Sequence, residues 1–314
     1  MRGFRFGFTL ATHDSPAELA QTCGTAQAYG YDAALAVDHL GTGRSAPFQT
    51  ALAAALATEH LRVGTFVLNI GLWNPTVLAR EVATALRLTS GRFELGLGAG
   101  TVKSQFDAAG IAWHDLAGRM DQLRAAILTL RELLAREQGL TPPPLMIGGT
   151  SGHALRLAAG HADIASFGGR VQVPGQPFGT LRLLTAQETT RRVESFRSLA
   201  GPRLPEIELN AFIIDVEVTD DREAAAERIV ADDPGQMTPE QALDSPFVLI
   251  GSEEEIARQI LERRERYGFS YFTVQRHHMA ALGPSIKRVH DLAEPVSPPR
   301  STVGHRPAAQ GTGG

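Results

Sequence analysis

The stretch Gly91–Thr101, with the sequence GRFELGLGAGT, decides the fold of this chain. Its residues alternate between two faces, and a period of two predicts a β-strand. The apolar face consists of Phe93, Leu95, Leu97 and Ala99. The other face begins charged and then loses its side chains, in the order Arg92, Glu94, Gly96, Gly98 and Gly100.

Glycine inside a strand is unfavourable unless a ligand or another backbone segment must approach closely. A strand that loses its side chains toward its C-terminal end suits a parallel barrel strand with a flat ligand at the barrel mouth. The alternative is that the glycines serve a β-bulge or packing alone. The stretch by itself does not choose between these two interpretations.

Composition excludes several classes of partner. The chain has 314 residues, is 43% hydrophobic, and carries a net charge of −4, which gives no reason to expect nucleic acid or an anionic membrane. Cys23 is the single cysteine, so neither a disulfide framework nor a cysteine metal site is expected. The N-terminal sequence MRGFRFGFTLATHD has no signal-peptide pattern. We therefore expect a soluble, cytoplasmic protein.

Eight predicted strands alternate with helical segments. The strands are Phe4–Thr9, Ala33–Val37, Arg62–Leu68, the opening stretch, Leu145–Ile147, Ala162–Phe167, Glu206–Val216 and Ser270–Gln275. This order predicts an α/β fold, a (β/α)8 TIM barrel over residues 1–294, with helical insertions before the last strand at Asp220–Gln236 and Thr238–Leu243. An open doubly wound sheet is less favoured, because no G-x-G-x-x-G motif follows the first strand.

Other segments complete this prediction. Helices are expected at Thr76–Leu88, Gly118–Arg136, Ser151–Ala159, Ala186–Leu199, Ser252–Tyr267 and Pro284–Leu292. The Gly- and Pro-rich segment Gly168–Gly179 is expected to be a loop, and the tail 295–314 is expected to be disordered.

In a parallel barrel, functional groups follow the strands. The second strand ends in Asp38-His39, which either transfers a proton or merely caps the next segment. The turn Gly148-Gly149-Thr150 opens a helix and either binds an anion or is an ordinary tight turn. The last strand is followed by Arg276, His277 and His278, which suit a substrate anion or a solvated face. No histidine spacing is typical of a metal site, so no metal is predicted.

Four blocks together resemble the bacterial luciferase-like superfamily, and most closely its coenzyme F420-dependent oxidoreductases. They are LRVGTFVLNIGLWNPTVLAREVATALRLTSGRFELGLGAG (61–100), AYGYDAALAVDHLGT (28–42), PPLMIGGTSGHALRLAAGHADIA (143–165) and VLIGSEEEIARQILERRERYGFSYFTV (248–274). The resemblance covers residues 4–292. It implies a TIM barrel that holds the tricyclic deazaflavin ring at its C-terminal mouth.

The resemblance also implies site residues. His39 would be catalytic, near the reactive ring carbon, and Thr65-Phe66 falls where family members have a cis non-proline peptide. The residues implied to bind the cofactor are Asp38, Thr65, Phe66, Asn69, Gly98, Ala99, Gly100, Thr101, Gly148, Gly149 and Thr150, with the Gly-Gly-Thr turn taking the phosphate.

Three positions depart from the family pattern. Sugar-phosphate dehydrogenases of the family place a glutamate general acid where this chain has Thr101, so sugar-phosphate oxidation is disfavoured. Gln105 stands where many relatives have an acidic residue. Between Leu134 and Leu145 relatives carry a longer insertion that walls the substrate side, and here only ten residues intervene. This predicts an open pocket for a bulky substrate, such as a secondary metabolite or modified peptide, with Gly168–Gly179 as the lid.

The function implied is a reductase that transfers hydride from reduced F420 to an activated C=C or C=N bond, with His39 or water as the proton source. Two alternatives stay open: a luciferase-like monooxygenase that uses flavin mononucleotide (FMN), and a barrel that binds a ligand without catalysis. A homodimer formed through the helices near the second and third strands is usual for the family.

Overall fold

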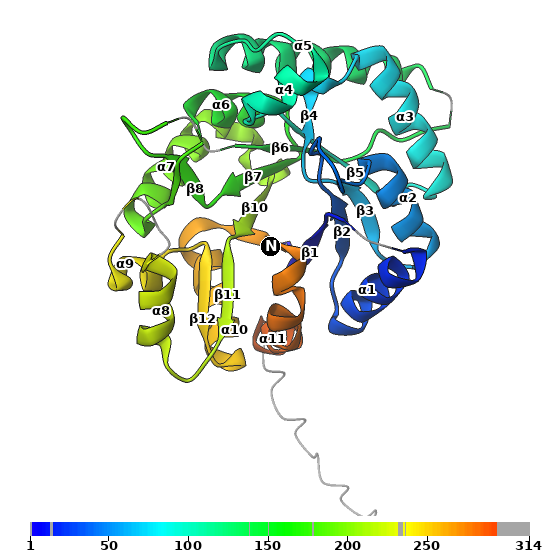
Figure 1. The fold of residues 1–314 in the computed structure, drawn as a ribbon. Coiled ribbons are helices and arrows are strands. Elements are labelled where there is room, and N and C mark those ends of the chain that lie inside the picture. The colour runs from blue at the N-terminus through cyan, green and yellow to red at the C-terminus, as the bar shows by residue number, and fades with distance from the viewer. Residues whose placement is uncertain are drawn as a thin grey trace, which may run out of the picture.

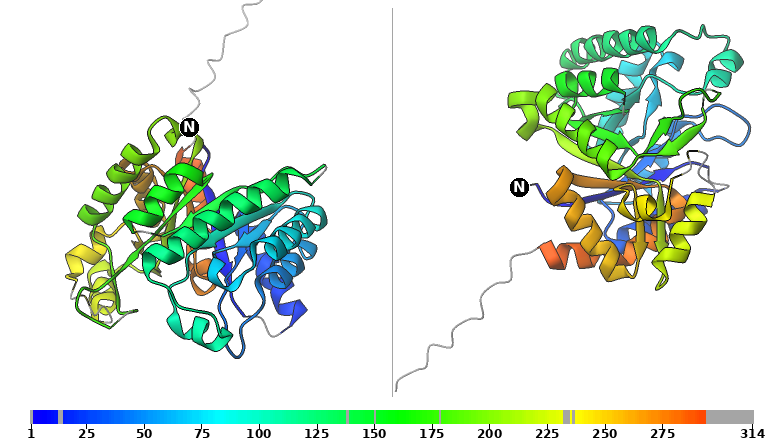
Figure 2. Two further views of the ribbon diagram at one scale, coloured as in Figure 1. Left: turned by 90° about the horizontal axis from the view of Figure 1, so that it is seen from above. Right: turned by 90° about the vertical axis from the view of Figure 1, so that its left-hand side faces the viewer.

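The computed structural model describes residues 2–12, 15–137, 139–149, 151–177, 179–231, 235 and 237–293. The expected disordered tail 295–314 and the predicted site residue Thr150 lie outside these residues. Eight parallel strands close into a barrel, because β3 pairs with both β2 and β5. The helices form a ring around the strands (Figure 1) and cover their outside in two further views (Figure 2). The TIM barrel is therefore confirmed.

The barrel strands match the eight predicted strands in order. They are β1 (Arg5–Leu10), β2 (Ala33–Ala36), β3 (Arg62–Thr65), β5 (Phe93–Gly98), β6 (Leu145–Gly148), β7 (Ile164–Gly168), β10 (Glu208–Ile213) and β13 (Phe269–Val274), with the short β4 (Leu68–Asn69) beside β5.

The outer helices are α1 (Pro16–Tyr29), α2 (Pro47–Leu56), α3 (Pro75–Leu88), α4 (Lys103–Ala109), α5 (Leu116–Ala135), α6 (Gly152–His161), α7 (Ala186–Ala200), α10 (Glu253–Tyr267) and α11 (Met279–Ala293). Short 3-10 turns are η1 (Ile70–Leu72), η2 (Gly201–Glu206) and η3 (Arg276–His278). The last helix begins five residues before the predicted start, Pro284, because Met279 and Leu282 extend its buried stripe.

We expected the insertion before the last strand to be helical, but it also contains strands. Besides α8 (Arg222–Ala231) and α9 (Pro239–Asp244), it contains two parallel strands, β11 (Asp215–Val218) and β12 (Val248–Gly251). The predicted strand Glu206–Val216 is therefore two strands, β10 and β11, and the four-residue run of β12 is too short for its periodicity to be recognised.

The segment Gly168–Gly179 is also more regular than predicted. Its residues Arg170–Gln172 form β8, which pairs in antiparallel register with β9 (Leu181–Leu183). Part of the expected loop therefore belongs to a β-hairpin, in which Pro174, Gly175, Pro177 and Gly179 lie between the strands, whereas Gly168 ends β7.

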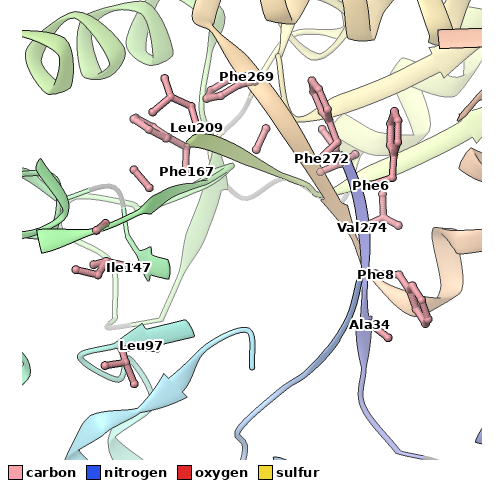
Figure 3. Packing of buried hydrophobic residues seen from close by; sticks show 14 of the residues in the cluster. Phe6, Phe8, Ala34, Leu97, Ile147, Phe167, Leu209, Phe269, Phe272 and Val274 are labelled. Carbon is pink, nitrogen blue, oxygen red and sulfur yellow. The ribbon is translucent and has the colours of Figure 1, made fainter. Parts of the chain in front are cut away.

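Buried apolar side chains form two layers. The outer layer lies between strands and helices and includes Phe6 and Phe272, whose ring centroids are 6.1 Å apart (Figure 3). The inner layer fills the barrel and consists of Ala33, Leu35, Met146, Ile164 and Tyr271, with Phe66 and Val67 packed against it. The alternation along the strands thus separates helix-facing from axis-facing side chains, as the period of two predicts.

Glu94, the charged residue near the start of β5, lies inside the barrel at the end where the strands begin. Glu94 is 1% exposed and contacts the guanidinium groups of Arg5 and Arg62, the latter at 2.6 Å from Nε. Burial by itself lowers the pKa of Arg5, but Glu94, Tyr271 and Glu208 outweigh it and raise that pKa above its ordinary value. A buried carboxylate is tolerated when cations pair with it, and these two arginines satisfy that condition.

The glycines of β5 accommodate a bulge in the neighbouring strand. Gly64 pairs with Glu94 and Leu68 pairs with Leu97, so one extra residue lies on the β3–β4 side. A Cβ atom on Gly96 would lie 2.1 Å from the Thr65 carbonyl oxygen. The bare face is therefore filled by the chain itself, as the packing interpretation holds: by Thr65 at Gly96, by Val67 at Gly98 and by Asn69 at Gly100.

The segment between α5 and β6 does not border the barrel mouth. Its residues Leu140–Pro144 line a cavity of about 1230 Å³ together with Arg5 and Arg62, at the end of the barrel where strands begin. The expectation that a short segment here opens the substrate pocket is wrong, because a segment that leads into a strand lies at the end opposite to the mouth.

Two surface observations complete the fold. None of the described helices is both long and apolar enough to cross a membrane. On α2 and α3, where the sequence predicts the homodimer contact, Leu56 and Leu88 are 86% and 62% exposed.

The close approach of β3 to β5 predicts the effect of a single methyl group. We expect Gly96→Ala to lower the free energy of unfolding by about 2 kcal/mol or more, because the methyl group meets backbone that cannot rotate away. Gly24→Ala is the matched control, since Gly24 lies within α1 and a Cβ there meets nothing within 4 Å. Urea unfolding measures both variants, and equal midpoints would contradict this account.

Candidate active site

Two connected cavities lie where the barrel strands end. The smaller has a volume of about 330 Å³ and the larger about 750 Å³. They share the residues Ala99, Gly100, Thr101, Val102, Gly148, Gly149 and Gly168. We call them the inner cavity and the outer cavity.

Three adjacent strands end in glycine at the inner cavity. Gly98 closes β5, Gly148 closes β6 and Gly168 closes β7, and all three line this cavity. The Val67 side chain supports two of them, since Cβ atoms on Gly98 and Gly148 would lie 2.7 and 3.4 Å from its methyl groups. Val67 thus takes the space of side chains at Gly98 and Gly148, whereas a Cβ on Gly168 would meet nothing within 4 Å, and the cavity is bordered by backbone at all three strand ends.

The cis peptide bond of this region joins Phe66 and Val67, one residue beyond the predicted position Thr65-Phe66. Thr65 still belongs to β3, and its hydroxyl donates to the Gly96 carbonyl and accepts from the Gly96 N–H, both at 2.9 Å. Phe66 and Val67 line the inner cavity, whereas Thr65 does not. The prediction that Thr65 belongs to the site is therefore wrong. Thr65 is buried in β3, and its hydroxyl is hydrogen-bonded to the backbone of Gly96.

Asp38 fixes the chain around the bulge. Its Oδ2 accepts hydrogen bonds from the backbone N–H of Asn69 at 3.0 Å and from Trp73 Nε1 at 2.9 Å. Asn69 in turn accepts from the Gly71 N–H through Oδ1, and a Cβ on Gly100 would lie 2.3 Å from that oxygen. The buried carboxylate therefore orients the loop that borders the cavity.

His39 follows Asp38 and is exposed at the inner cavity. Its Nδ1 lies 3.0 Å from Nε2 of Gln105, a residue of α4. Next to Gln105, Phe106 is buried, lies against Gly71, and makes an edge contact with Trp113 at 4.9 Å between ring centroids. Thus α4, which we did not predict, is anchored by Phe106 and brings Gln105 to His39. The left-handed Gly110 that ends this helix was the available sequence signal.

The outer cavity carries the cationic side chains. Arg191 and Arg192 of α7 and Arg170 of β8 line it, together with the first turn of α6 at Ser151 and Gly152. Burial lowers the pKa of Arg192, whose Nη1 donates to the Glu188 carbonyl oxygen at 3.2 Å. A helix N-terminus beside several guanidinium groups favours an anion.

The hairpin that borders the outer cavity is tied to α7. Arg182 of β9 donates to both carboxylate oxygens of Glu188, at 2.9 and 2.6 Å. These hydrogen bonds lower the pKa of Glu188 to about 2. The pair therefore stays ionised at neutral pH and holds the hairpin against the helix that carries Arg191 and Arg192.

The residues after the last strand do not line either cavity. Arg276 donates to Glu18 Oε1 at 2.8 Å and to the Thr12 carbonyl oxygen at 3.2 Å. His278 lies 3.7 Å from Asp215, and burial lowers its pKa. Of the two interpretations that the sequence left for this segment, a substrate-anion site receives no support, because its arginine is already paired.

Most of the predicted site residues meet at the inner cavity. Those that line it are Asp38, His39, Phe66, Asn69, Gly98, Ala99, Gly100, Thr101, Gly148 and Gly149. Sequence reasoning did not assign Val67, Phe212 or the three arginines to the site. Phe212 lies within the predicted strand Glu206–Val216, for which we did not predict which side chains face the barrel axis. Among the described residues no group of three or more His, Cys, Asp or Glu is placed to hold a metal ion.

The sequence model of the luciferase-like monooxygenase family matches residues 3–233 of this chain. The chain belongs to this family. An F420-dependent glucose-6-phosphate dehydrogenase of Rhodococcus jostii is 34% identical over 139 residues, which make up 41% of each protein. An enzyme of the same name from Kribbella flavida is 28% identical over 262 residues, 76% of each protein.

Solved structures of the luciferase-like family share the fold. An F420-dependent secondary alcohol dehydrogenase, solved in complex with an F420-acetone adduct, superposes with a TM-score of 0.71 at 17% identity. The superposition covers 92% of this chain and 99% of that one. The barrel and the family predicted from the sequence are therefore both confirmed.

Proposed function

We propose that this chain is an F420-dependent oxidoreductase that reduces an activated C=C or C=N bond. The observation that carries the proposal is the pair of connected cavities: one has glycine strand ends and His39, and the other has a helix N-terminus and arginines. The names of the relatives from Rhodococcus and Kribbella, which are F420-dependent, support this choice of cofactor.

The residues present suit the parts of this cofactor. The tricyclic ring is flat, and Gly98, Gly148 and Gly168 leave a rim without side chains above Val67. The cofactor tail is anionic, and the outer cavity supplies Arg191, Arg192 and the first turn of α6. The two cavities are continuous through seven shared residues, so one elongated ligand can occupy both.

When bound in its reduced form, F420 supplies a hydride, and the chain supplies binding, orientation and a proton route. Phe66 and Val67 would hold the ring, while Gly149 of the predicted Gly-Gly-Thr turn would hold the phosphate together with Ser151, Gly152 and Arg192. One atom of the substrate double bond accepts the hydride, and the other gains a proton from His39 or from water. The products are a saturated substrate and the oxidised cofactor, so electrons and protons balance.

Two features shape the choice of reaction. Thr101 lines both cavities where sugar-phosphate dehydrogenases of the family place a glutamate, so we do not transfer their substrate to this chain. The expectation of a bulky substrate depended on the segment between Leu134 and Leu145, which lies at the other end of the barrel. That segment therefore does not limit the size of the substrate.

Cofactor binding tests the proposal directly. We expect equilibrium fluorescence titration to give tighter binding of F420 than of FMN. Removing two cations with the double variant Arg191→Ala and Arg192→Ala should raise the Kd for F420 about tenfold or more, as expected for lost charge-assisted hydrogen bonds. Arg258→Ala is the control, because Arg258 pairs with Glu254 on α10 and lines neither cavity. Tighter binding of FMN would favour the monooxygenase alternative.

The role of His39 predicts a separation between binding and turnover. We expect His39→Ala to lower turnover about 10²–10⁴-fold at saturating reduced F420, because a positioned proton donor contributes about that much, with the Kd for F420 nearly unchanged. His60→Ala is the matched control, since the His60 side chain is 79% exposed and lines neither cavity. Unchanged turnover of the His39 variant would remove that residue from the mechanism. Bound cofactor with no turnover of any substrate would favour the non-catalytic alternative.

A further inference from the structure

Charge is distributed unequally between the two cavities. The outer cavity has three arginines, whereas the ionisable groups among the described residues that line the inner cavity are Asp38 and His39. Asp38 is not available to a ligand cation, because its Oδ2 already accepts from Asn69 and Trp73. The side of the site that would face the substrate thus offers no fixed cation along its described lining.

Two cations that follow barrel strands, Lys103 after β5 and Arg276 after β13, are paired within the chain. Lys103, which begins α4, lies 2.7 and 2.8 Å from the two carboxylate oxygens of Asp107. Arg276 is held by Glu18. Arg44 stands on the loop after His39 and is exposed, but it does not line either cavity. An anionic substrate would therefore have to leave water without a cation placed to receive it, which is unfavourable.

Apolar groups surround the remaining space. Besides Phe66 and Val67, which would hold the ring, Phe212 and Ala99 line the inner cavity, and the Phe212 ring centroid lies 5.0 Å from that of Phe66. Val102, which lines both cavities, is 36% exposed. Exposed apolar side chains beside a cavity are typical of a site that binds an apolar ligand.

One polar contact available to a neutral ligand is the His39–Gln105 pair, which lines the inner cavity together with Thr101. A carboxamide nitrogen can only donate, so the 3.0 Å contact from Gln105 Nε2 makes His39 Nδ1 an acceptor. The ring hydrogen is then on Nε2, which is left to donate. An N–H donor of this kind suits the carbonyl oxygen of an uncharged molecule and requires no negative charge on it.

We propose that the substrate is an uncharged, mainly apolar carbonyl compound, such as an α,β-unsaturated ketone, whose oxygen is bound by His39 in the orientation set by Gln105. This inference rests on the proposed function and names its substrate class. The β-carbon then accepts the hydride, the α-carbon gains its proton from water, and the carbonyl group, whose oxygen stays hydrogen-bonded to His39 Nε2–H, is retained.

The test compares two probes that differ in charge but hardly in shape, 3-oxocyclohex-1-ene-1-carboxamide and the corresponding carboxylate. Binding of each to the F420-loaded protein is measured by saturation-transfer NMR titration. We expect the carboxamide to bind at least about tenfold more tightly, which corresponds to a modest penalty for an unpaired charge. Equal or tighter binding of the carboxylate, or no saturable binding of the carboxamide, would overturn the inference.

Two variants make the comparison sharper. Val102→Lys places a cation at the rim and should shift the ratio toward the carboxylate about tenfold, whereas the uncharged control Val102→Gln should leave the ratio near that of the parent chain. Arg44→Ala should leave the ratio unchanged, and a loss of carboxylate binding in this variant would show that Arg44 recognises anions, against the inference. F420 loading is measured first by fluorescence, so failure of cofactor binding, which would sink the proposed function, is distinguishable. In that case the two probes are titrated against the chain alone.

Discussion

The close approach of β3 to β5 is the constraint on which the rest of the mouth depends. The Thr65 carbonyl oxygen occupies the space where a side chain at position 96 would begin. The Thr65 hydroxyl donates a hydrogen bond to the Gly96 carbonyl oxygen and accepts one from the Gly96 N–H. The extra residue of the bulge places Val67 under the glycine ends of β5 and β6. The same segment brings Asn69 to Asp38, whose neighbour in the chain is His39. The bulged segment from Thr65 to Asn69 thus positions Val67 beneath the glycine strand ends and contacts Asp38, the neighbour of the candidate proton donor His39.

Charged residues of this barrel lie in two places: in its interior near the strand starts, and on one side of the mouth. The lower interior contains Glu94 between Arg5 and Arg62, where ionic groups stabilise one another away from the mouth. Above it, Asn210 bonds Ser166 and Thr273 across three strands. At the mouth the described lining is nearly uncharged on the His39 side and cationic on the α7 side. This polarity supports the proposed direction of the cofactor, in which the ring would lie at His39 and the anionic tail at the arginines.

Regular elements were predictable because each is determined by a local pattern. The period of two separated Phe93, Leu95 and Leu97 from Glu94 and Gly96, and the structure places these sets on opposite sides of the barrel wall. Ser151 and Ser252 cap the helices that they were expected to begin. Most predicted site residues met at one cavity because parallel strands all end on one side.

The errors arose where tertiary contacts decide. Gly96 makes room for Thr65, a residue 31 positions earlier, and no local pattern distinguishes that from room for a ligand. The helix α4 depends on Phe106 packing against Gly71 and Trp113. The segment before β6 was assigned to the mouth by analogy with relatives, although the direction of α5 places it at the opposite end. The arginines of α7 came to the outer cavity through packing between helices and strands far apart in sequence.

A crystal structure of this protein with F420 bound tests the central claim most directly. The account predicts the ring in the inner cavity, over Val67 and between Gly98 and Gly148, with its reactive carbon toward His39. The phosphate should lie at the first turn of α6 near Arg192. A ring bound in the outer cavity, or a phosphate directed toward His39, would contradict it.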